Sequence, residues 1–490
     1  MNVPILSSLI FLPVVGMFLV MVTPRDRTHL IRVIATVITA IVLGVSVKLL
    51  LSFNTASSEI QFAERLLWIP QLNVFYSLGI DGISLPMVLA TALLSFLACI
   101  ASFGITERVK EYFALYLLLE TGMMGTFLAL DLFLFYIFWE VVLVPMYFLI
   151  GIWGGPRKEY AAIKFFLYTL AGSMFMLIGI LALYFASTPL TFDMMALGKN
   201  VFPLRFQQVI FMALFFGFAI KVPIFPFHTW LPDAHVEAPT PISVLLAGVL
   251  LKMGAYGFFR ISYPILPGAA RWFGPYMGIL AVIGIIYGGF VAFAQKDFKK
   301  MVAYSSVSHM GFVLLGLAVF TATGFNGALL QMFNHAMITG GLFLLVGVLY
   351  DRTHTRDLDA LGGIWVKMPV YGGVLIFITL ASLGLPGLAG FVSEFMVLMG
   401  SYLVYRWMTI ASCLGILLAA AYLLYMIQRV LLGKLNPKWV HVTDINRREL
   451  FTLVPLMILI LLVGIYPKIA LQYFTPTLQA LVGLLGGKPL

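Results

Sequence analysis

Lys221 is a charged residue at a position where a charge is costly. The twenty residues before it, 201–220, hold one charge, Arg205, near their start. Two prolines follow closely in the run Lys-Val-Pro-Ile-Phe-Pro, and a helix broken at membrane depth is tolerated only beside a buried site or a wet cavity. Because an ammonium in an apolar membrane helix costs several kcal/mol, it is expected to serve a purpose. The pattern predicts ion handling within a membrane.

Three more charges interrupt apolar stretches. Glu140 is flanked by aromatic and aliphatic residues, Lys252 lies near the middle of its stretch, and Glu394 is the only charge between residues 367 and 406. Structural alternatives exist: Glu140 could simply neutralise a buried lysine, and Lys252 could extend its amine to the lipid headgroups. The depth of Glu394 depends on how the Gly- and Pro-containing segment 383–394 breaks its helix. We favour the hypothesis that all three residues carry or tune protons.

Two histidines lie between Lys252 and Glu394 in the sequence. His309 and His335 fall on adjacent predicted helices, and imidazole titrates near neutral pH and can pass protons through either nitrogen. Four hydroxyl residues precede His309, and they suit either a hydrated path or ordinary contacts between helices: Tyr304, Ser305, Ser306 and Ser308. Packing through hydrogen bonds remains the alternative for both histidines.

Four further polar residues follow Lys221: His228, Asp233, His235 and Glu237. They could in principle bind a metal, but their spacing matches no standard metal motif. The Pro-rich segment that carries them is better interpreted as a loop end or the mouth of a cavity. Asp131, between two apolar stretches, is predicted to be a solvated loop residue.

A row of such charges can move protons if each group responds to its neighbour. Two unit charges about 10 Å apart at an effective dielectric near 20 interact by about 1.7 kcal/mol. Moving one proton against about 150–200 mV costs roughly 3.5–4.6 kcal/mol, so two or three such couplings in series are enough. The sequence contains no nucleotide-binding loop, flavin site or metal-cluster ligands. The drive must therefore come from an ion gradient or from partner subunits.

The composition is that of a membrane protein. Of 490 residues, 62% are hydrophobic and 10% charged, and apolar runs of bilayer-spanning length recur throughout. The net charge of +10 is concentrated in short loops, which favours a cytoplasmic membrane face over nucleic-acid binding. Cys99 and Cys413 lie within apolar runs and offer no metal or disulfide pattern.

The apolar runs predict an all-α polytopic protein with about fourteen transmembrane helices. The first run lacks a basic leader and a cleavage site, so we expect a retained helix rather than a signal peptide. Lys and Arg are about twice as frequent in the odd-numbered loops, which predicts that both termini are periplasmic. The predicted spans are 4–22, 30–52, 82–103, 112–130, 132–152, 162–186, 207–226, 239–262, 273–294, 301–320, 324–350, 369–400, 407–431 and 450–470.

An internal repeat is visible in the sequence. At an offset of 168 residues, Gly172, Phe175 and Gly179 fall on Gly340, Phe343 and Gly347. Five helices separate the two copies, so they would have opposite membrane orientations, as in the inverted repeats of many transporters. The broken segment 383–394 lies five helices after the Lys221 break, where a counterpart is expected. Chance similarity between Gly-, Leu- and Phe-rich helices is the alternative.

Two motifs resemble a known family. The first is Phe135-Tyr-Ile-Phe-Trp-Glu140-Val-Val-Leu-Val-Pro-Met146. The second begins Lys221-Val-Pro-Ile-Phe-Pro-Phe-His-Thr-Trp-Leu-Pro-Asp-Ala-His-Val-Glu and ends Leu-Leu-Lys252-Met-Gly-Ala-Tyr-Gly257. Together they closely resemble the antiporter-like membrane subunits of respiratory complex I, and among these the M-type chain. The second motif is highly specific, and the likeness covers nearly the whole chain.

The resemblance implies a role for each matching residue. Glu140, Lys221, Lys252 and Glu394 would form the proton relay, with glutamate at 394 where sister chains carry lysine. His309 and His335 match the connecting histidines less securely. The family's core would place helices 1–3 at 1–111, two inverted five-helix repeats at 112–262 and 273–431, and a cytoplasmic loop with helix 14 at 432–490. The chain would end just after that helix and lack the long lateral helix of the largest sister chain.

The resemblance also assigns the cofactors to other chains. NADH, FMN, iron–sulfur clusters and quinone are expected in partner subunits, with none held here. The expected partners are other membrane-arm subunits, including sister antiporter-like chains, within the lipid bilayer of a bacterial inner membrane. Two alternatives remain: a subunit of a multi-subunit cation/proton antiporter, and a subunit of a related ferredoxin-, deazaflavin- or hydrogenase-linked complex. A structural membrane scaffold is a third, simpler possibility.

Overall fold

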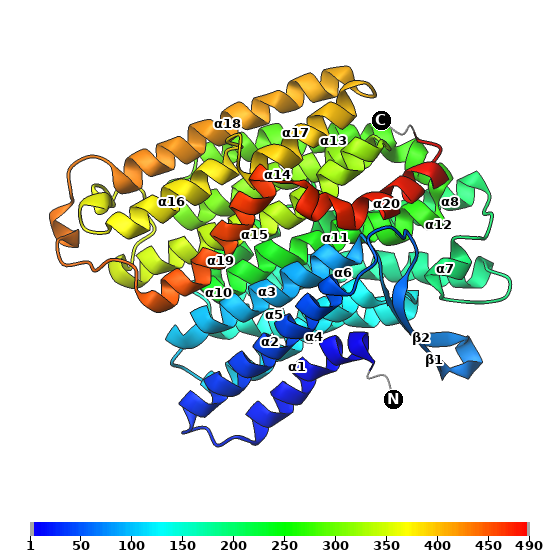
Figure 1. Ribbon diagram of the computed structural model, residues 1–490, viewed down its shortest axis with the longest axis horizontal. Coiled ribbons are helices and arrows are strands. Elements are labelled where there is room, and N and C mark those ends of the chain that lie inside the picture. The colour runs from blue at the N-terminus through cyan, green and yellow to red at the C-terminus, as the bar shows by residue number, and fades with distance from the viewer. Residues whose placement is uncertain (1–3, 488–490) are drawn as a thin grey trace.

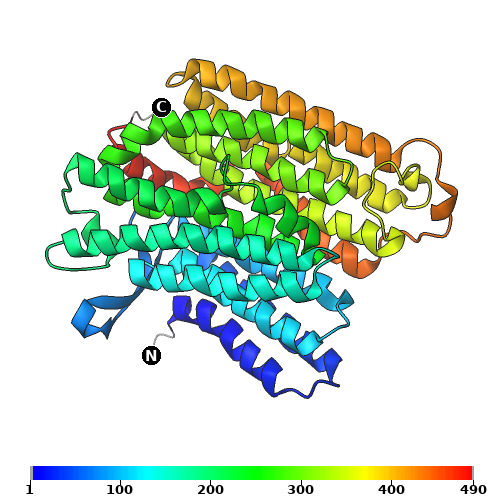
Figure 2. The ribbon, with the colours of Figure 1, turned by 180° about the vertical axis from the view of Figure 1, so that it is seen from behind.

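The computed structural model describes residues 4–487 as a bundle of long helices (Figures 1 and 2). The predicted outer domains 1–111 and 432–490 extend over residues 1–3 and 488–490, which lie outside the described residues. The α-helices are α1 (Ile5–Val22), α2 (Thr28–Leu51), α3 (Ser84–Ala101), α4 (Val109–Leu128), α5 (Leu132–Trp153), α6 (Lys158–Ala186), α7 (Met194–Leu197), α8 (Leu204–Lys221), α9 (Trp230–Glu237), α10 (Thr240–Leu245), α11 (Leu251–Gly257), α12 (Tyr263–Ile265), α13 (Pro267–Phe293), α14 (Phe298–Ala318), α15 (Ala322–Thr353), α16 (Pro369–Ser382), α17 (Ala389–Tyr402), α18 (Arg406–Leu431), α19 (Arg447–Ile465) and α20 (Lys468–Leu484).

Shorter helical segments complete the described chain. Two π-helical stretches, η3 (Leu246–Leu250) and η4 (Phe258–Ser262), join α10, α11 and α12 into one continuous span. The remaining segments are 3₁₀ turns: η1 (Pro70–Leu72), η2 (Ser102–Gly104), η5 (Ile364–Val366) and η6 (Pro437–Trp439).

Within residues 4–487, twelve helices are long and apolar enough to cross a membrane, so the protein is multi-pass. Two predicted spans fall outside these twelve: 112–130 corresponds to α4, and 369–400 corresponds to α16 and α17 with a break between them. The count of fourteen crossings stays a prediction. The helical fold class itself is borne out.

Two elements were not predicted from the sequence. The loop before the third span forms an antiparallel hairpin of β1 (Gln61–Ile69) and β2 (Val74–Ile80), so the fold is not purely helical. The hairpin extends beyond the helices at one end of the bundle (Figure 1). In addition, the helix α20 follows α19, whereas the sequence predicted that the last helix ends near residue 470. One face of α20 is buried through residues spaced along a helix: Phe474, Leu478, Leu481 and Leu485.

Burial separates central helices from peripheral ones. The continuous span 240–265 is buried except near its two ends, and most of α14 and α15 is buried as well. By contrast, α1, α2 and α18 expose apolar side chains over most of their surfaces, which suits contact with lipid or with apolar partner helices. The outer helices α1 and α18 lie at opposite edges of the bundle (Figures 1 and 2). The central helices carry three of the six predicted proton sites, namely Lys252, His309 and His335.

Asp131 is not a solvated loop residue as predicted. Its side chain is fully buried and caps α5, with Oδ1 accepting hydrogen bonds from the backbone N–H groups of Phe133 and Leu134. Its Oδ2 accepts a third from Phe75 of the hairpin at 3.2 Å. Burial raises the pKa of Asp131 to about 6. The carboxylate joins the hairpin to the start of α5.

Two isolated β-bridges join turns in the two halves of the chain. One pairs Asp131 with Asp193, and the other pairs Asp297 with Asp357. In the first, Leu132 N donates to Phe192 O at 2.8 Å; in the second, Phe298 N donates to Arg356 O at 2.8 Å. Each bridge therefore connects the turn before one long helix with the turn after the next.

Candidate functional site

Lys221 is the last residue of α8, and it is almost completely buried. Its Nζ has no hydrogen-bond partner among the described residues. The ammonium lies over two aromatic rings, 5.4 Å from the centroid of Trp139 and 5.6 Å from that of Phe165. Such cation–π contacts stabilise the charged form, although less than water does. The residue is thus charged, buried and free of directional bonds.

Glu140, the acid predicted to act with Lys221, lies on α5 next to Trp139. It is half-buried, and its Oε1 meets no hydrogen-bond donor among the described residues. Its carboxylate attracts the Lys221 ammonium electrostatically, but no hydrogen bond or ion pair within 4 Å joins them. The two groups therefore form a loose pair whose coupling can change with small movements.

The break after Lys221 exposes backbone groups that tertiary contacts satisfy. Pro223 and Pro226 interrupt the helix, and α9 begins eight residues past Val222. The indole Nε1 of Trp230 donates to the carbonyl of Ile220 at 2.9 Å, which fastens α9 to the end of α8. This contact fixes the backbone position from which Lys221 projects.

Gly254 allows α11 to approach the end of α8 closely. A Cβ at this position would lie 2.6 Å from the carbonyl oxygen of Phe218 and 3.1 Å from Cβ of Lys221. Gly254→Ala should therefore push the helices apart, displace Lys221 and cost about 1–3 kcal/mol through overpacking. We expect lower thermal stability and lower proton translocation together. Gly44→Ala is the matched control, since nothing lies within 4 Å of a Cβ there, and equal effects in both variants would refute this account.

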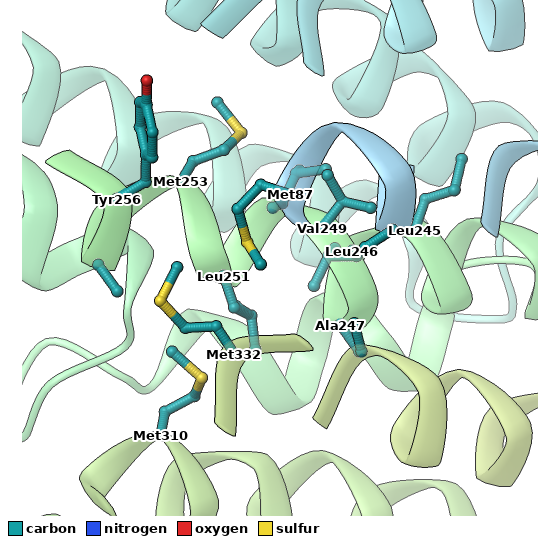
Figure 3. Packing of buried hydrophobic residues seen from close by; sticks show 14 of the residues in the cluster. Met87, Leu245, Leu246, Ala247, Val249, Leu251, Met253, Tyr256, Met310 and Met332 are labelled. Carbon is teal, nitrogen blue, oxygen red and sulfur yellow. The ribbon is translucent and has the colours of Figure 1, made fainter. Parts of the chain in front are cut away.

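Lys252 is the second buried lysine, and π-helix η3 lies directly before it. Its Nζ donates to the carbonyl of Ala247 at 2.5 Å and lies 2.6 Å from Nδ1 of His335. A π-helical turn widens the helix, and such turns occur frequently at functional sites. Figure 3 shows apolar side chains around this stretch, with Met87, Met310 and Met332 gathered near Leu251. The Lys252 amine thus has two polar partners, of which His335 is titratable.

A second histidine, His309, extends the contact between Lys252 and His335 towards Glu394. The rings of His335 and His309 have centroids 5.8 Å apart. His309 Nδ1 lies 2.7 Å from Oε1 of Glu394. Helices α11, α15, α14 and α17 therefore bring four predicted site residues into one buried chain: Lys252, His335, His309 and Glu394.

Polar side chains hold Glu394 in place. Gln331 Nε2 donates to its Oε1 at 3.0 Å, and Ser393 Oγ donates to Oε1 of Gln331 at 2.5 Å. A small cavity of about 10 Å³ lies between Glu394, the two histidines and Ser382, and this is about the space that one water requires. Glu394 is therefore buried and oriented, with a possible water site beside it.

The structure divides the predicted row into two groups. Glu140 and Lys221 form one, and the chain from Lys252 to Glu394 forms the other. No hydrogen bond or ion pair joins the two groups among residues 4–487. The Lys221 ammonium lies against α5 and α6, whereas the Lys252 amine contacts α15. Passage between the lysines would need water or movement.

The four polar residues after Lys221 do not form one cluster. No group of three or more His, Cys, Asp or Glu side chains suited to a metal occurs in the described part of the chain. The His228 ring packs against Phe225 and Tyr287. The buried His235 ring stacks on Phe343 with centroids 4.7 Å apart. Asp233 and Glu237 instead accept contacts from Lys164 and Arg157 on α6 and the turn before it.

Sequence analysis missed several buried ionisable residues. Glu120 is fully buried in α4 with neither oxygen hydrogen-bonded among the described residues, and Lys299 is buried at the start of α14. Arg260 of η4 forms a buried ion pair with Asp81 and also bonds to Ser84. Glu120 could have been found, since it is the only charge in the predicted span 112–130. The Arg260–Asp81 pair joins residues far apart in sequence and gives no such signal.

A cavity of about 460 Å³, which we call the loop cavity, opens where the predicted odd-numbered loops meet. Gly155, Glu237, Lys299, Asp351 and Arg448 are among its lining residues. These residues come from the fifth, seventh, ninth, eleventh and thirteenth predicted loops. The loops that the charge bias assigned to one face therefore do share one end of the bundle.

Comparison with known proteins gives consistent matches. The family model described as NADH:quinone oxidoreductase/Mrp antiporter, TM, matches residues 129–420. NADH-quinone oxidoreductase subunit M of Rickettsia bellii (strain RML369-C) is 42% identical over 98% of this chain and 99% of its own length. A chain in the structure of respiratory complex I from Thermus thermophilus with bound NADH is 31% identical, with a TM-score of 0.91 over 99% of this chain and 100% of that one. A chain of the Mrp complex from Dietzia sp. DQ12-45-1b shares the fold at 19% identity, with a TM-score of 0.86 over 99% and 100%.

These matches define the class of protein. The chain belongs to the NADH:quinone oxidoreductase/Mrp antiporter family of transmembrane proteins. Within that family it is of the M type of antiporter-like complex I subunit. The resemblance drawn from the sequence motifs is thereby confirmed.

Proposed function

We propose that this chain is a proton-translocating membrane-arm subunit of a redox-driven NADH-quinone oxidoreductase. Quinone reduction in other subunits supplies the energy. The chain is therefore part of a translocating enzyme and carries no redox site of its own. The proposed relay has six members: Glu140, Lys221, Lys252, His335, His309 and Glu394.

The chain of contacts from Lys252 to Glu394 is the observation that carries this proposal. Its two end links measure 2.6 and 2.7 Å, and the imidazole rings between them are 5.8 Å apart. Protons can pass along it because each imidazole accepts a proton at one nitrogen and releases one at the other. Burying ionisable groups costs more than burying amides or hydroxyls, so a purely structural network would not need four of them.

The Glu140–Lys221 pair supplies the control step of this mechanism. Without hydrogen bonds, the Lys221 ammonium depends on attraction from Glu140 and on the rings of Trp139 and Phe165. Weakening that attraction favours release of the Lys221 proton towards Lys252. The two lysines repel each other when both are charged, so protonation of one promotes deprotonation of the other. Partner subunits would control this step by displacing the Glu140 carboxylate relative to Lys221.

Two inverted repeats, 112–262 and 273–431, organise this relay. The two β-bridges support the repeat, since each joins the turn before α5 or α14 with the turn after α6 or α15. The Asp131 bridge lies beside the hairpin, whereas Lys299 and Arg356, next to the Asp297 bridge, border the loop cavity. With the two bridges at different ends of the bundle, the two repeats would have opposite orientations, and one half would open to each side of the membrane.

The proposed setting follows from the relatives. The chain would assemble with other membrane-arm subunits, including sister antiporter-like chains, in a bacterial inner membrane with both termini periplasmic. NADH, FMN, iron–sulfur clusters and quinone would be bound by partners. In the family, glutamate rather than lysine at 394 is the M-type feature, and this chain has it.

A cation/proton antiporter subunit is the second candidate function. The fold shared with the Mrp complex chain supports this candidate, although a sequence identity of 19% shows only that the fold is the same. Co-purification separates the two: isolation with iron–sulfur and quinone-reducing subunits supports the redox complex. Sodium-dependent proton exchange by a complex that lacks such subunits would refute the redox-complex proposal.

His309→Gln tests the relay itself. The change removes the group that joins His335 to Glu394 while keeping a polar side chain, so proton translocation per electron should fall about fivefold or more in the purified complex. Proton uptake into proteoliposomes and quinone reduction should be measured together. His441→Gln, at an exposed position, is the matched control. Normal translocation by the assembled His309→Gln complex would exclude this path.

A further inference from the structure

The two helix breaks have the same backbone hydrogen-bond pattern. At the first, Val222, Ile224 and Phe227 donate to Phe218, Ala219 and Ile224. At the second, Leu383, Leu385 and Leu388 donate to Thr379, Leu380 and Leu385. Each residue of the second set lies 161 positions after its counterpart (222 and 383, 224 and 385, 227 and 388). This register aligns the breaks residue by residue.

This alignment decides which residues of the two repeats occupy equivalent positions. Lys221 aligns with Ser382 and not with Glu394. Glu394 aligns with Asp233, which follows Lys221 by the same interval at which Glu394 follows Ser382. Each repeat therefore carries a carboxylate at the same place after its break.

The two carboxylates are also held in the same way. Lys164 Nζ on α6 donates to Oδ2 of Asp233 at 2.8 Å, and Gln331 Nε2 on α15 donates to Oε1 of Glu394 at 3.0 Å. The helices α6 and α15 occupy matching places, since each precedes the turn that a β-bridge pairs. At the offset of 168 residues Lys164 falls on Met332, one position after Gln331. The acid of this two-residue unit therefore recurs at the same place, and its donor comes from a neighbouring position of the matching helix, with an ammonium in one repeat and an amide in the other.

The first unit is more open than the second. The Lys164 and Asp233 side chains are 20% and 18% exposed, against 4% for Glu394. Arg157, in the turn before α6, lies 3.7 Å from Asp233 and 3.7 Å from Glu237, and Glu237 borders the loop cavity. Asp233 can therefore exchange protons with water at that end of the bundle.

The first unit shares helix α6 with a residue that contacts Lys221. Lys164 precedes Phe165, whose ring lies 5.6 Å from the Lys221 ammonium. While Asp233 is ionised, the Lys164–Asp233 pair has no net charge. A proton bound by Asp233 leaves the Lys164 ammonium uncompensated, which adds a positive charge to α6, the helix that also contributes Phe165 to the Lys221 site.

We propose that Asp233, held by Lys164, is a further proton-exchanging residue, the first-repeat counterpart of Glu394, and that it takes up protons at the end of the bundle where the loop cavity opens. The inference rests on the proposed function. The proton leaves water, binds the Asp233 carboxylate and later returns or moves inward, so no other reactant is required.

The test uses the intact purified complex with four variants. Asp233→Asn should lower proton translocation per electron about fivefold and flatten its dependence on pH. The double variant Lys164→Gln with Asp233→Glu copies the Glu394 unit and should keep at least half of the translocation. The double variant Lys164→Met with Asp233→Leu removes both charges together, which avoids an unpaired buried charge if Asp233→Asn fails to assemble, and it should translocate as poorly as Asp233→Asn.

The fourth variant, Glu394→Gln, separates this inference from the proposed function. If Glu394→Gln impairs translocation while the Lys164→Met, Asp233→Leu complex translocates normally, the inference is wrong and the proposed function stands. If both translocate normally, the proposed function fails as well. Loss of translocation in the Lys164→Gln, Asp233→Glu complex would overturn the equivalence of the two units.

Discussion

Lys221→Met should reduce proton translocation by the complex at least tenfold while assembly is retained. The Lys221 side chain already lies against Trp139 and Phe165 and makes no hydrogen bond among the described residues. Methionine has a similar length and suits this apolar surrounding, so the variant should fold. It cannot carry a proton, and the electrostatic link from Glu140 to Lys252 would be lost. Proton uptake and quinone reduction in proteoliposomes measure the effect.

Two comparisons make the Lys221 result specific. Lys48→Met changes an exposed lysine near the end of α2 and should leave translocation unchanged. Lys221→Arg keeps a charge that does not release its proton near neutral pH, so it should be as defective as Lys221→Met. A Lys221→Arg complex that pumps normally would show that only the charge is needed and that Lys221 does not exchange protons.

Arg260→Met should destabilise the protein by about 3–5 kcal/mol, because it leaves the buried Asp81 carboxylate without its counter-ion. Both side chains of this ion pair are about 95% buried. Arg260 also donates to Ser84 Oγ at 3.0 Å and to the Tyr256 hydroxyl at 3.1 Å. We expect a large drop in the yield of assembled subunit and in its thermal stability.

The double variant Arg260→Met with Asp81→Leu distinguishes two explanations. Removing both charges leaves no unpaired ion, so most of the lost stability should return. The exposed Arg25–Glu111 pair provides the control, since Arg25 is 79% exposed and its loss should cost about 0–1 kcal/mol. If Arg260→Met is no more harmful than Arg25→Met, the buried pair does not stabilise the junction of α3 and η4.

The sequence predicted much of the site because buried charge is rare in membrane helices. Lys221, Lys252 and Glu394 each interrupt an apolar run, and the structure buries all three. The sequence could not predict that His335 bonds to Lys252 and that His309 bonds to Glu394, because these partners lie 83 and 85 residues apart in the chain. Such contacts depend on which helices pack together.

Elements outside the apolar runs were harder to predict. The hairpin β1–β2 is short and turns through Asn73 in a left-handed conformation, which hydropathy does not detect. The helix α20 buries one face only and carries Pro476 within it. The internal repeat was visible, but its alignment at the breaks was not, because the matching feature is backbone hydrogen bonding. Lys221 and Ser382 share no side-chain chemistry that would align them.

The two π-helical stretches limit how the central span can move. Each stretch adds a residue to a helical turn, and one residue corresponds to about 100° of rotation around an α-helix. Rewinding η3 into a regular helix would therefore turn Lys252 away from His335, and rewinding η4 would turn Arg260 away from Asp81. A helix constrained at both places cannot rotate or slide as a unit without losing both contacts. During turnover this span would stay fixed within the subunit, and only side chains and water around it would move.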